Sequence, residues 1–127
     1  MQLKMQEILG YTVFYDTVAK QKLPLKTSYK LAKFSKAVET ELQFYQEKLR
    51  KIIFDYALLD EQGEPILLED GSGVKLRPGV DKECNEAMEE LQNIEVNIPD
   101  FNLTLDELES LELTLVEMNY ILPFITE

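Results

Sequence analysis

Apolar residues recur every three or four positions through most of this chain, which predicts a mostly helical protein. Residues 2–20 carry a broad apolar face whose weakest point is Gly10, and Pro24 separates this first predicted helix from the next segment. From residue 27 or 28 to residue 59 the apolar positions alternate in steps of four and three, over about four heptads. Neither Gly nor Pro interrupts this segment. We therefore expect one helix of about 30 residues, some 45 Å long.

The apolar stripe of this long predicted helix is wider than the seam of a two-stranded coiled coil. Phe34, Phe44, Ile53 and Phe54 extend it beyond the heptad positions. A wide apolar face is typical of a helix that packs inside a globular domain. The pattern therefore favours packing within the chain, with a long dimeric coiled coil as the alternative.

After residue 59 the helical periodicity ends, and turn-forming residues and short segments of strand-like pattern follow. Turn-forming residues occupy 60–63 and 70–73, and the apolar segments 66–68 and 74–76 predict an antiparallel hairpin. Asp81 can cap a short helix over residues 82–93. Residues 94–98 alternate apolar and polar side chains and end at Pro99. Because two strands alone are marginal in water, we expect residues 94–98 to join the hairpin as a third strand.

One short pattern occurs twice near the C-terminus. Thr104 precedes Glu107 by three residues, and Thr114 precedes Glu117 in the same way. Thr-x-x-Glu at the head of an apolar periodic stretch is the capping box that starts a helix. The repeat favours two short consecutive helices over a repeated binding site. Pro123 ends the second helix and is followed by an apolar C-terminus.

Together these segments predict an α+β fold that is predominantly helical. It has a long central helix with a packed N-terminal helix, a small antiparallel hairpin or sheet, and short C-terminal helices. A length of 127 residues, 45% of them apolar, predicts a single domain with its own core over residues 1–127. Within it, residues 1–59 form a basic helical half, and residues 60–127 form an acidic half with the hairpin and the short helices.

The net charge of −11 is divided unevenly along the chain. Residues 1–54 hold ten Lys and Arg against five acids, which gives +5, and residues 55–127 hold three against nineteen, which gives −16. A stripe of lysines on the long predicted helix has the spacing to contact phosphates: Lys26, Lys30, Lys33 and Lys36. The acidic half would repel nucleic acid, so the stripe is better suited to the chain's own acidic half or to an acidic partner. No direct binding of nucleic acid is expected.

The residue types exclude several kinds of catalytic site. The chain has no His and a single Cys, so it contains neither a Ser-His nor a Cys-His arrangement. Cys84 lies among acids, which disfavours a reactive thiolate. Asp55, in an apolar stretch, is the best candidate for a carboxyl with a raised pKa, although a place on the polar face of its helix is favoured. We expect no enzyme activity, no cofactor and no metal site, and the sequence shows neither a signal peptide nor a membrane span.

A series of short motifs runs through most of the chain: Leu23, Pro24, Lys26, Ser28 to Lys33, Glu47, Lys48, Leu49, Gly63, Leu105 to Glu109, Leu113, Thr114, Glu117 and Leu122 to Ile125. The order of these motifs resembles a family of small uncharacterised proteins of tailed phages and prophages of Gram-positive bacteria. The family's "EKYG" is replaced here by "FDYALL" at residues 54–59. The resemblance implies phage origin, a location in the cytoplasm of the bacterial host, and the family's fold.

Two functions fit these observations. The first is a small acidic protein that binds a host or phage protein with a basic, nucleic-acid-binding surface, such as a defence complex, and inhibits it by electrostatic mimicry. The second is a virion or assembly protein that acts through the long helix and the apolar C-terminus, with self-association left open. The candidate partner-binding residues are Asp100, Asp106, Glu109, Glu112, Glu117, Leu122, Phe124 and Ile125.

Overall fold

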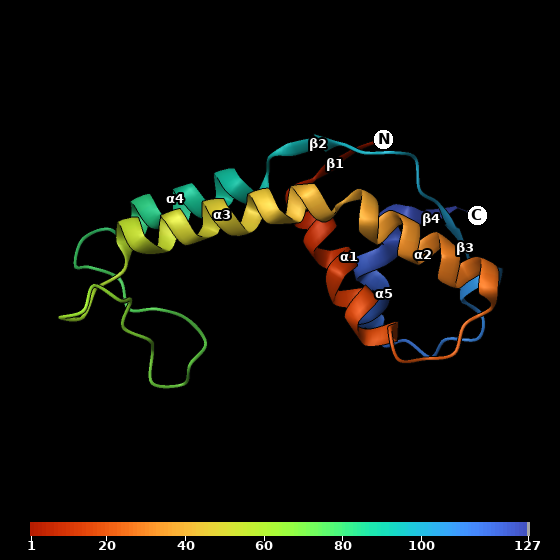
Figure 1. The fold of residues 1–127 in the computed structure, drawn as a ribbon, viewed down its shortest axis with the longest axis horizontal. Coiled ribbons are helices and arrows are strands. Elements are labelled where there is room, and N and C mark those ends of the chain that lie inside the picture. Colours follow the sequence, from red (N-terminus) through yellow and green to blue (C-terminus); the bar gives the residue numbers. More distant parts are fainter. Residues whose placement is uncertain (127) are drawn as a thin grey trace. The chain divides into compact units, whose positions relative to one another are not determined.

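The structure is a computed structural model that describes residues 1–126. The described residues form five α-helices, two short 3-10 helices and four short strands (Figure 1). They divide into two compact units: unit 1 comprises residues 1–42 and the residues from 95 onward, and unit 2 comprises residues 43–94. The predicted α+β class with a predominance of helix is confirmed.

Unit 1 brings the first and last segments of the chain together. Its helices are α1 (Met5–Val18), α2 (Leu25–Ala37) and α5 (Leu115–Ile121), and α1 and α5 lie side by side (Figure 1). β1 (Gln2–Lys4) pairs antiparallel with β2 (Glu95–Asn97), and β3 (Leu103–Thr104) pairs parallel with β4 (Ile125–Thr126). The 3-10 helices η1 (Asp106–Leu108) and η2 (Leu122–Phe124) complete it. The pairings of α1 with α5, of β1 with β2 and of β3 with β4 therefore join distant parts of the sequence.

Four aromatic rings from four elements form the centre of unit 1. The rings of Phe34 and Phe101 stack with centroids 4.1 Å apart, and Tyr11 meets Phe34 edge to face at 4.7 Å. Phe124 packs its ring against all three of the others. Such aromatic pairs contribute more than the area they bury, because ring edges and faces carry opposite partial charges. The cluster joins α1, α2, the segment after β2 and η2 into one core.

The hydroxyl group of Tyr11 is the polar centre of this core. It donates a hydrogen bond to the carbonyl oxygen of Leu31 at 2.8 Å and lies 2.8 Å from the hydroxyl of Ser35, which can donate to it in turn. Burial raises the pKa of Tyr11 to about 12, because an ionised phenolate would lose its hydration. The tyrosine therefore remains neutral and fixes α1 against α2.

Unit 2 is a pair of helices joined by a long connection. α3 (Glu39–Tyr56), which begins in unit 1 and runs through unit 2, lies beside α4 (Asp81–Gln92) (Figure 1). In the connection, residue pairs Ala57 with Leu76, Leu59 with Pro65, and Leu67 with Val74 form isolated antiparallel bridges. Of residues 43–94, only Ala57 and Leu91 are buried. Unit 2 consequently has very little core of its own.

The prediction of one continuous central helix is wrong. The segment forms α2 and α3, which meet at Val38, where ψ is −1° instead of the roughly −42° of an α-helix. Val38 is completely buried, and its N–H still bonds to the carbonyl oxygen of Phe34. Helix bends usually coincide with Pro or Gly, and neither is present here. Tertiary packing therefore decides where this helix ends.

The prediction of a three-stranded sheet around the hairpin is also wrong. Residues 95–97 belong to unit 1, where β2 pairs with β1. The third segment of the hairpin region is instead the end of α3 and the residues after it. The N–H of Leu58 donates to the carbonyl oxygen of Lys75, and the N–H of Ile66 donates to that of Leu58. A pairing between residues 67 and 74, as in the predicted hairpin, is confirmed.

Several predicted helix ends shift by a few residues. Residues 2–4, expected to open the first helix, form β1, because their alternating burial suits a strand edge better than a helix turn. Asp81 begins α4 and makes no side-chain capping bond. Thr104 and Glu107 form the predicted capping contacts, but only the single turn η1 follows them. The second capping box, Thr114 with Glu117, starts α5 as predicted.

Gly10 allows α1 and α5 to pack closely. A Cβ added at Gly10 would lie 3.2 Å from a ring carbon of Tyr120. Replacing Gly10 with Val should lower the free energy of unfolding by about 1–3 kcal/mol, because two further carbons would be forced against this ring. Gly10→Ala adds only the Cβ and gains helix propensity, so it should cost clearly less. Urea denaturation would compare the two variants, and equal stability of wild type and Gly10→Val would contradict close packing at this position.

Candidate protein-binding site

The last part of unit 1 exposes apolar and acidic side chains in the same short segment. Within residues 105–122, four large apolar side chains are more than half exposed: Leu105 (57%), Leu115 (86%), Val116 (61%) and Leu122 (55%). The carboxylates of Asp106, Glu109 and Glu112 lie in the same segment and are also exposed. We call these seven residues the mixed surface. They share one stretch of the sequence, and exposed apolar patches mark interaction sites more often than single exposed side chains do.

The helix α5 explains how apolar residues come to face outward. Its inner side packs on α1 and carries the completely buried Ile121. Leu115, Asn119 and Leu122 are spaced four and three residues apart and are exposed, so they form a stripe on the outer side. The capping box holds the first turn of α5, since the N–H of Glu117 donates to the Thr114 hydroxyl at 3.1 Å. Leu115 is therefore presented on an ordered turn.

The three carboxylates of the mixed surface precede this helix. Asp106 and Glu109 lie in and directly after η1, three residues apart, and Glu112 follows two residues before the cap residue of α5. Lys30–Glu107 and the N-terminal amino group with Asp100 are the ion pairs found among residues 1–126. Asp106, Glu109 and Glu112 thus form no ion pair within the described residues.

Glu107 anchors η1 to α2. Its carboxylate accepts from the Lys30 Nζ at 2.9 Å, and from the N–H and the hydroxyl of Thr104 at 3.0 and 3.1 Å. The Lys30 Nζ also donates to the carbonyl oxygen of Asn102, and the Thr27 hydroxyl donates to that of Glu107. The bond from Lys30, joined by those from Thr104, holds the pKa of Glu107 below its usual range despite some burial. Lys30 of the predicted lysine stripe therefore does face the chain's own acidic half.

Replacing Glu107 with Gln should lower the free energy of unfolding by about 1 kcal/mol at pH 7, because a neutral amide loses the attraction to Lys30. A carboxyl whose pKa is lower in the folded state than its ordinary value of about 4.3 stabilises the fold at pH values above about 4.3. This stabilisation is lost as the pH falls through the pKa of the folded state. The difference between wild type and Glu107→Gln should therefore become smaller as the pH is lowered below about 4.3. Thermal denaturation of both proteins from pH 7 to pH 3 measures it, and a difference that does not change with pH would contradict the assigned role of Lys30.

The remaining candidate residues differ in how accessible they are. Asp100 is exposed and pairs with the N-terminal amino group at 3.0 Å. Glu117 is half-buried and engaged in its capping box, and Ile125 is half-buried in β4. Phe124 is completely buried in the aromatic cluster, so a partner cannot reach its side chain while unit 1 is folded. Of the predicted apolar tail, Leu122 is the residue that lies open.

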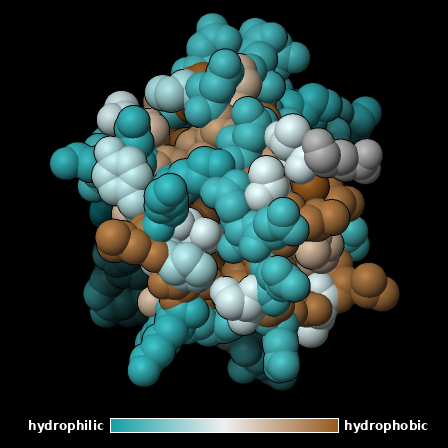
Figure 2. All heavy atoms as spheres, turned by 90° about the vertical axis from the view of Figure 1, so that its right-hand side faces the viewer, coloured by the Kyte–Doolittle hydropathy of each residue, from teal (hydrophilic) through white to brown (hydrophobic). Residues whose placement is uncertain are grey.

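A hollow at the beginning of α2 extends the accessible surface of unit 1. It has a volume of about 530 Å³ and is lined by Leu25, Lys26, Tyr29, Lys30 and Glu107. Leu25 is 86% exposed and Tyr29 is 64% exposed. Figure 2 shows that hydrophobic side chains reach the surface between hydrophilic ones on this side of the molecule. The sequence pattern assigned Tyr29 to the long helix and gave no sign of this hollow.

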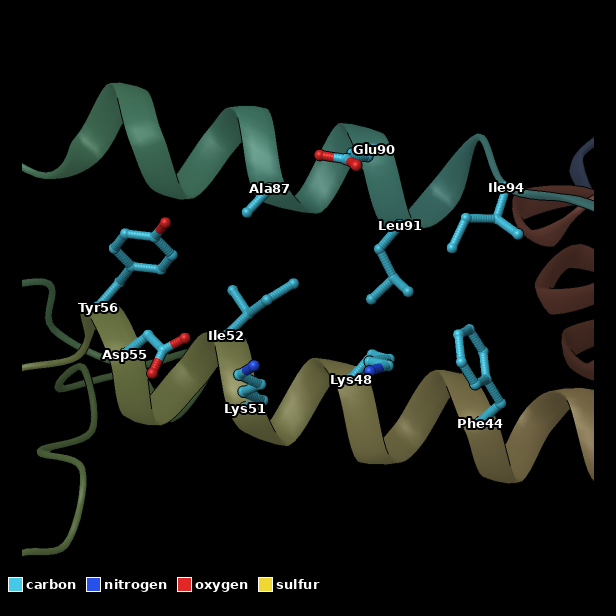
Figure 3. A pocket seen from close by; sticks show the side chains of 10 residues that line it. All are labelled: Phe44, Lys48, Lys51, Ile52, Asp55, Tyr56, Ala87, Glu90, Leu91 and Ile94. Atoms are coloured by element: carbon cyan, nitrogen blue, oxygen red, sulfur yellow. The ribbon is translucent and has the colours of Figure 1, made fainter.

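A second cavity lies between the helices of unit 2. It has a volume of about 330 Å³, and its floor is formed by Ile52 of α3 and by Ala87, Leu91 and Ile94 of the α4 side. Figure 3 shows these apolar side chains between the two helices. Lys48, Lys51, Asp55 and Glu90 also line the cavity, so charged groups border the apolar floor. Asp55 is exposed here, as expected for the polar face of a helix.

The described residues offer little for metal or membrane chemistry. Within residues 1–126, no three His, Cys, Asp or Glu side chains gather in a way that could hold a metal ion. None of the helices there could span a membrane.

No known protein family, curated protein or solved structure matches this chain. The resemblance to the phage family therefore stays a prediction from motif order.

Proposed function

We propose that this chain is a protein-binding module that recognises a basic protein surface through the mixed surface of unit 1. The observation that carries the proposal is the combination of four exposed apolar side chains with three exposed carboxylates within residues 105–122. Apolar contacts supply most of the affinity of a protein interface, and charges supply orientation and a fast association rate. A partner with cations around an apolar patch would complement both.

A protein that binds nucleic acid is the most suitable kind of partner. Its phosphate-binding surface presents Lys and Arg at regular spacing, which carboxylates of the mixed surface can meet in place of phosphates. The net charge of −11 would accelerate such an encounter over long distances. Occupation of that surface would inhibit the partner by mimicry of nucleic acid. In a phage-infected bacterium, a nucleic-acid-binding defence complex would be a partner of this kind.

The test is capture followed by competition. The immobilised chain is incubated with a nuclease-treated lysate of a Gram-positive bacterium, and the captured protein is identified and purified. Double-stranded DNA or RNA should then release the chain from its purified partner, because both occupy the same basic surface. A partner that binds nucleic acid and this chain at the same time would overturn the mimicry.

The second candidate is a virion or assembly protein. The half-exposed apolar side chains of unit 2 favour it, because they suit permanent contacts between subunits. The sequence had connected an assembly function with the long helix and the apolar C-terminus. In the structure the long helix is divided at Val38, and Phe124 of the C-terminus lies in the core. Mass spectrometry of purified phage particles distinguishes the two functions: an assembly protein would be present in the particles, and an inhibitor would be absent.

A further inference from the structure

Positive charge is concentrated on α2 and on the residues just before it. Residues 17–38 contain six lysines and no acid, although the whole chain has a net charge of −11. Five of these lysines are exposed and form no ion pair within residues 1–126: Lys20, Lys22, Lys26, Lys33 and Lys36. The sixth, Lys30, is half-buried and pairs with Glu107. This part of unit 1 therefore carries cations that the chain itself does not neutralise.

Exposed apolar side chains lie among the lysines of α2. Leu25 is 86% exposed and Tyr29 is 64% exposed, and the two residues are four positions apart on one face of the helix. Lys33 follows after four more residues, and its Nζ lies 5.9 Å from the centre of the Tyr29 ring. A cation close to the face of an aromatic ring is attracted to it. Apolar and cationic groups are thus presented side by side.

Two hollows meet at Tyr29 and Lys30. One is the hollow of about 530 Å³ described above, and the other, of about 370 Å³, is lined by α2 as far as Ala37. Their linings contain three lysines against two carboxylates, those of Asp100 and Glu107. Both carboxylates are already paired with a cation, Asp100 with the N-terminal amino group and Glu107 with Lys30. The charge that these hollows offer to a partner is therefore positive.

We propose that this surface binds a short acidic segment of another protein that carries large apolar side chains next to its carboxylates. We call Leu25, Lys26, Tyr29, Lys33 and Lys36 the basic face. Its lysines would meet the carboxylates, and the apolar side chains would enter the hollows beside Tyr29. Exposed Tyr rings often supply much of the affinity of an interface, and charge pairs supply its orientation. This inference concerns α2 and does not depend on the proposed function of the mixed surface.

Nucleic acid and a second copy of the chain fit the basic face less well. A nucleic acid carries a negative charge at every phosphate, so a chain of net charge −11 repels it more strongly than it repels a short peptide. Phosphates would also leave the apolar hollows unfilled. Two copies of the chain repel each other because both carry −11. A short segment with few carboxylates and several apolar side chains avoids both difficulties.

Selection from a library of short random peptides tests the chemistry of the occupant. The peptides are displayed on phage and selected on the immobilised full chain, and the enriched sequences are synthesised. They should contain Asp or Glu next to Leu, Ile or Phe. Enrichment of basic or uncharged peptides, or no enrichment at all, would overturn the proposal.

Substitution of three lysines locates the binding surface. Lys26→Gln, Lys33→Gln and Lys36→Gln together should raise the Kd of a selected peptide on the order of tenfold, because three charge pairs are lost. The effect should shrink at high salt, since exposed charges are then screened. Isothermal titration calorimetry measures the Kd, and circular dichroism checks that the variant keeps its helix content.

A matched control separates this surface from net charge. Three exposed lysines of unit 2 serve for it, in the variant Lys51→Gln, Lys75→Gln and Lys82→Gln. Both triple variants have a net charge of −14, because each substitution removes one positive charge. The control should bind the peptide like the wild type, and an equal loss in the two variants would contradict the basic face. Tyr29→Ala, which leaves every charge in place, should also weaken binding on the order of tenfold.

The other occupants are examined with the same proteins. Double-stranded DNA and single-stranded RNA are titrated in place of the peptide, and sedimentation equilibrium is measured on the wild type alone. Nucleic acid that binds as tightly as the peptide, and is weakened by the variant of α2, would replace the acidic segment as the occupant. Self-association of the wild type that this variant abolishes would assign the surface to a second copy instead.

Discussion

Reversal of three charges on the mixed surface should slow association with a basic partner by tenfold or more at low salt. The variant is Asp106→Lys, Glu109→Lys and Glu112→Lys, which changes the net charge from −11 to −5, because each substitution adds two positive charges. Electrostatic steering raises association rates by about 10- to 1,000-fold, and salt suppresses it. The loss should therefore be largest at low ionic strength and small near 1 M salt. Stopped-flow or surface plasmon resonance measurements with the captured partner give these rates.

A matched control distinguishes the location of the charges from their number. Glu61, Glu64 and Glu69 are exposed in the connection of unit 2, and their replacement with Lys also gives a net charge of −5. If the mixed surface is the contact, this control should lose only a small part of the association rate. Exposed charge changes alter stability by about 0.5 kcal/mol each, so both triple variants should remain folded. Equal losses in the two variants would mean that net charge, and not this surface, governs the encounter.

Truncation of Phe124 should be the most destabilising single change in unit 1. Its ring is completely buried against Tyr11, Phe34 and Phe101. Replacing a buried Phe with Ala typically costs about 3–5 kcal/mol, since the lost burial adds to the cost of the cavity. Because many domains have a total stability of only about 5–15 kcal/mol, the variant should unfold at a much lower urea concentration.

Leu122→Ala is the appropriate comparison, because Leu122 lies two residues away in the same 3-10 helix and is 55% exposed. It should change the free energy of unfolding by only about 0.5 kcal/mol. Urea denaturation followed by circular dichroism measures both. If Phe124→Ala were as stable as Leu122→Ala, the C-terminal turn would not be part of the core. Phe124 would then again be a candidate for binding a partner protein.

The features that were predictable from sequence are those set by local chemistry. Thr114 and Glu117 need only each other to start a helix, so the capping box identified the beginning of α5. The turn residues around Gly71, which has a φ of +73°, likewise fixed the bend between residues 67 and 74. Helix periodicity identified α1, most of α2 and α3, and α4, because each carries an apolar stripe.

The features that were missed depend on partners far away in the sequence. Leu3 belongs to a strand because Val96, more than ninety residues later, lies opposite to it. The break at Val38 depends on the burial of that side chain in unit 1. No Gly or Pro marks this position in the sequence, so the break was not predictable from it. The candidate site was likewise only partly predictable. The acids of the mixed surface were named from composition and spacing, but the exposure of Leu115 and the burial of Phe124 follow from how α5 and η2 pack.

The discontinuity of unit 1 has a consequence for its synthesis on the ribosome. Residues 1–42 emerge first, yet β1 acquires its partner strand only when residue 97 has been made, and the aromatic cluster is complete only with Phe124. At translation rates of about 5–20 residues per second, the roughly 55 residues between 42 and 97 take about 3–11 s. During this interval the apolar sides of α1 and α2 lack most of their cover. The nascent chain should therefore be a substrate for chaperones until Phe124 has emerged from the ribosome.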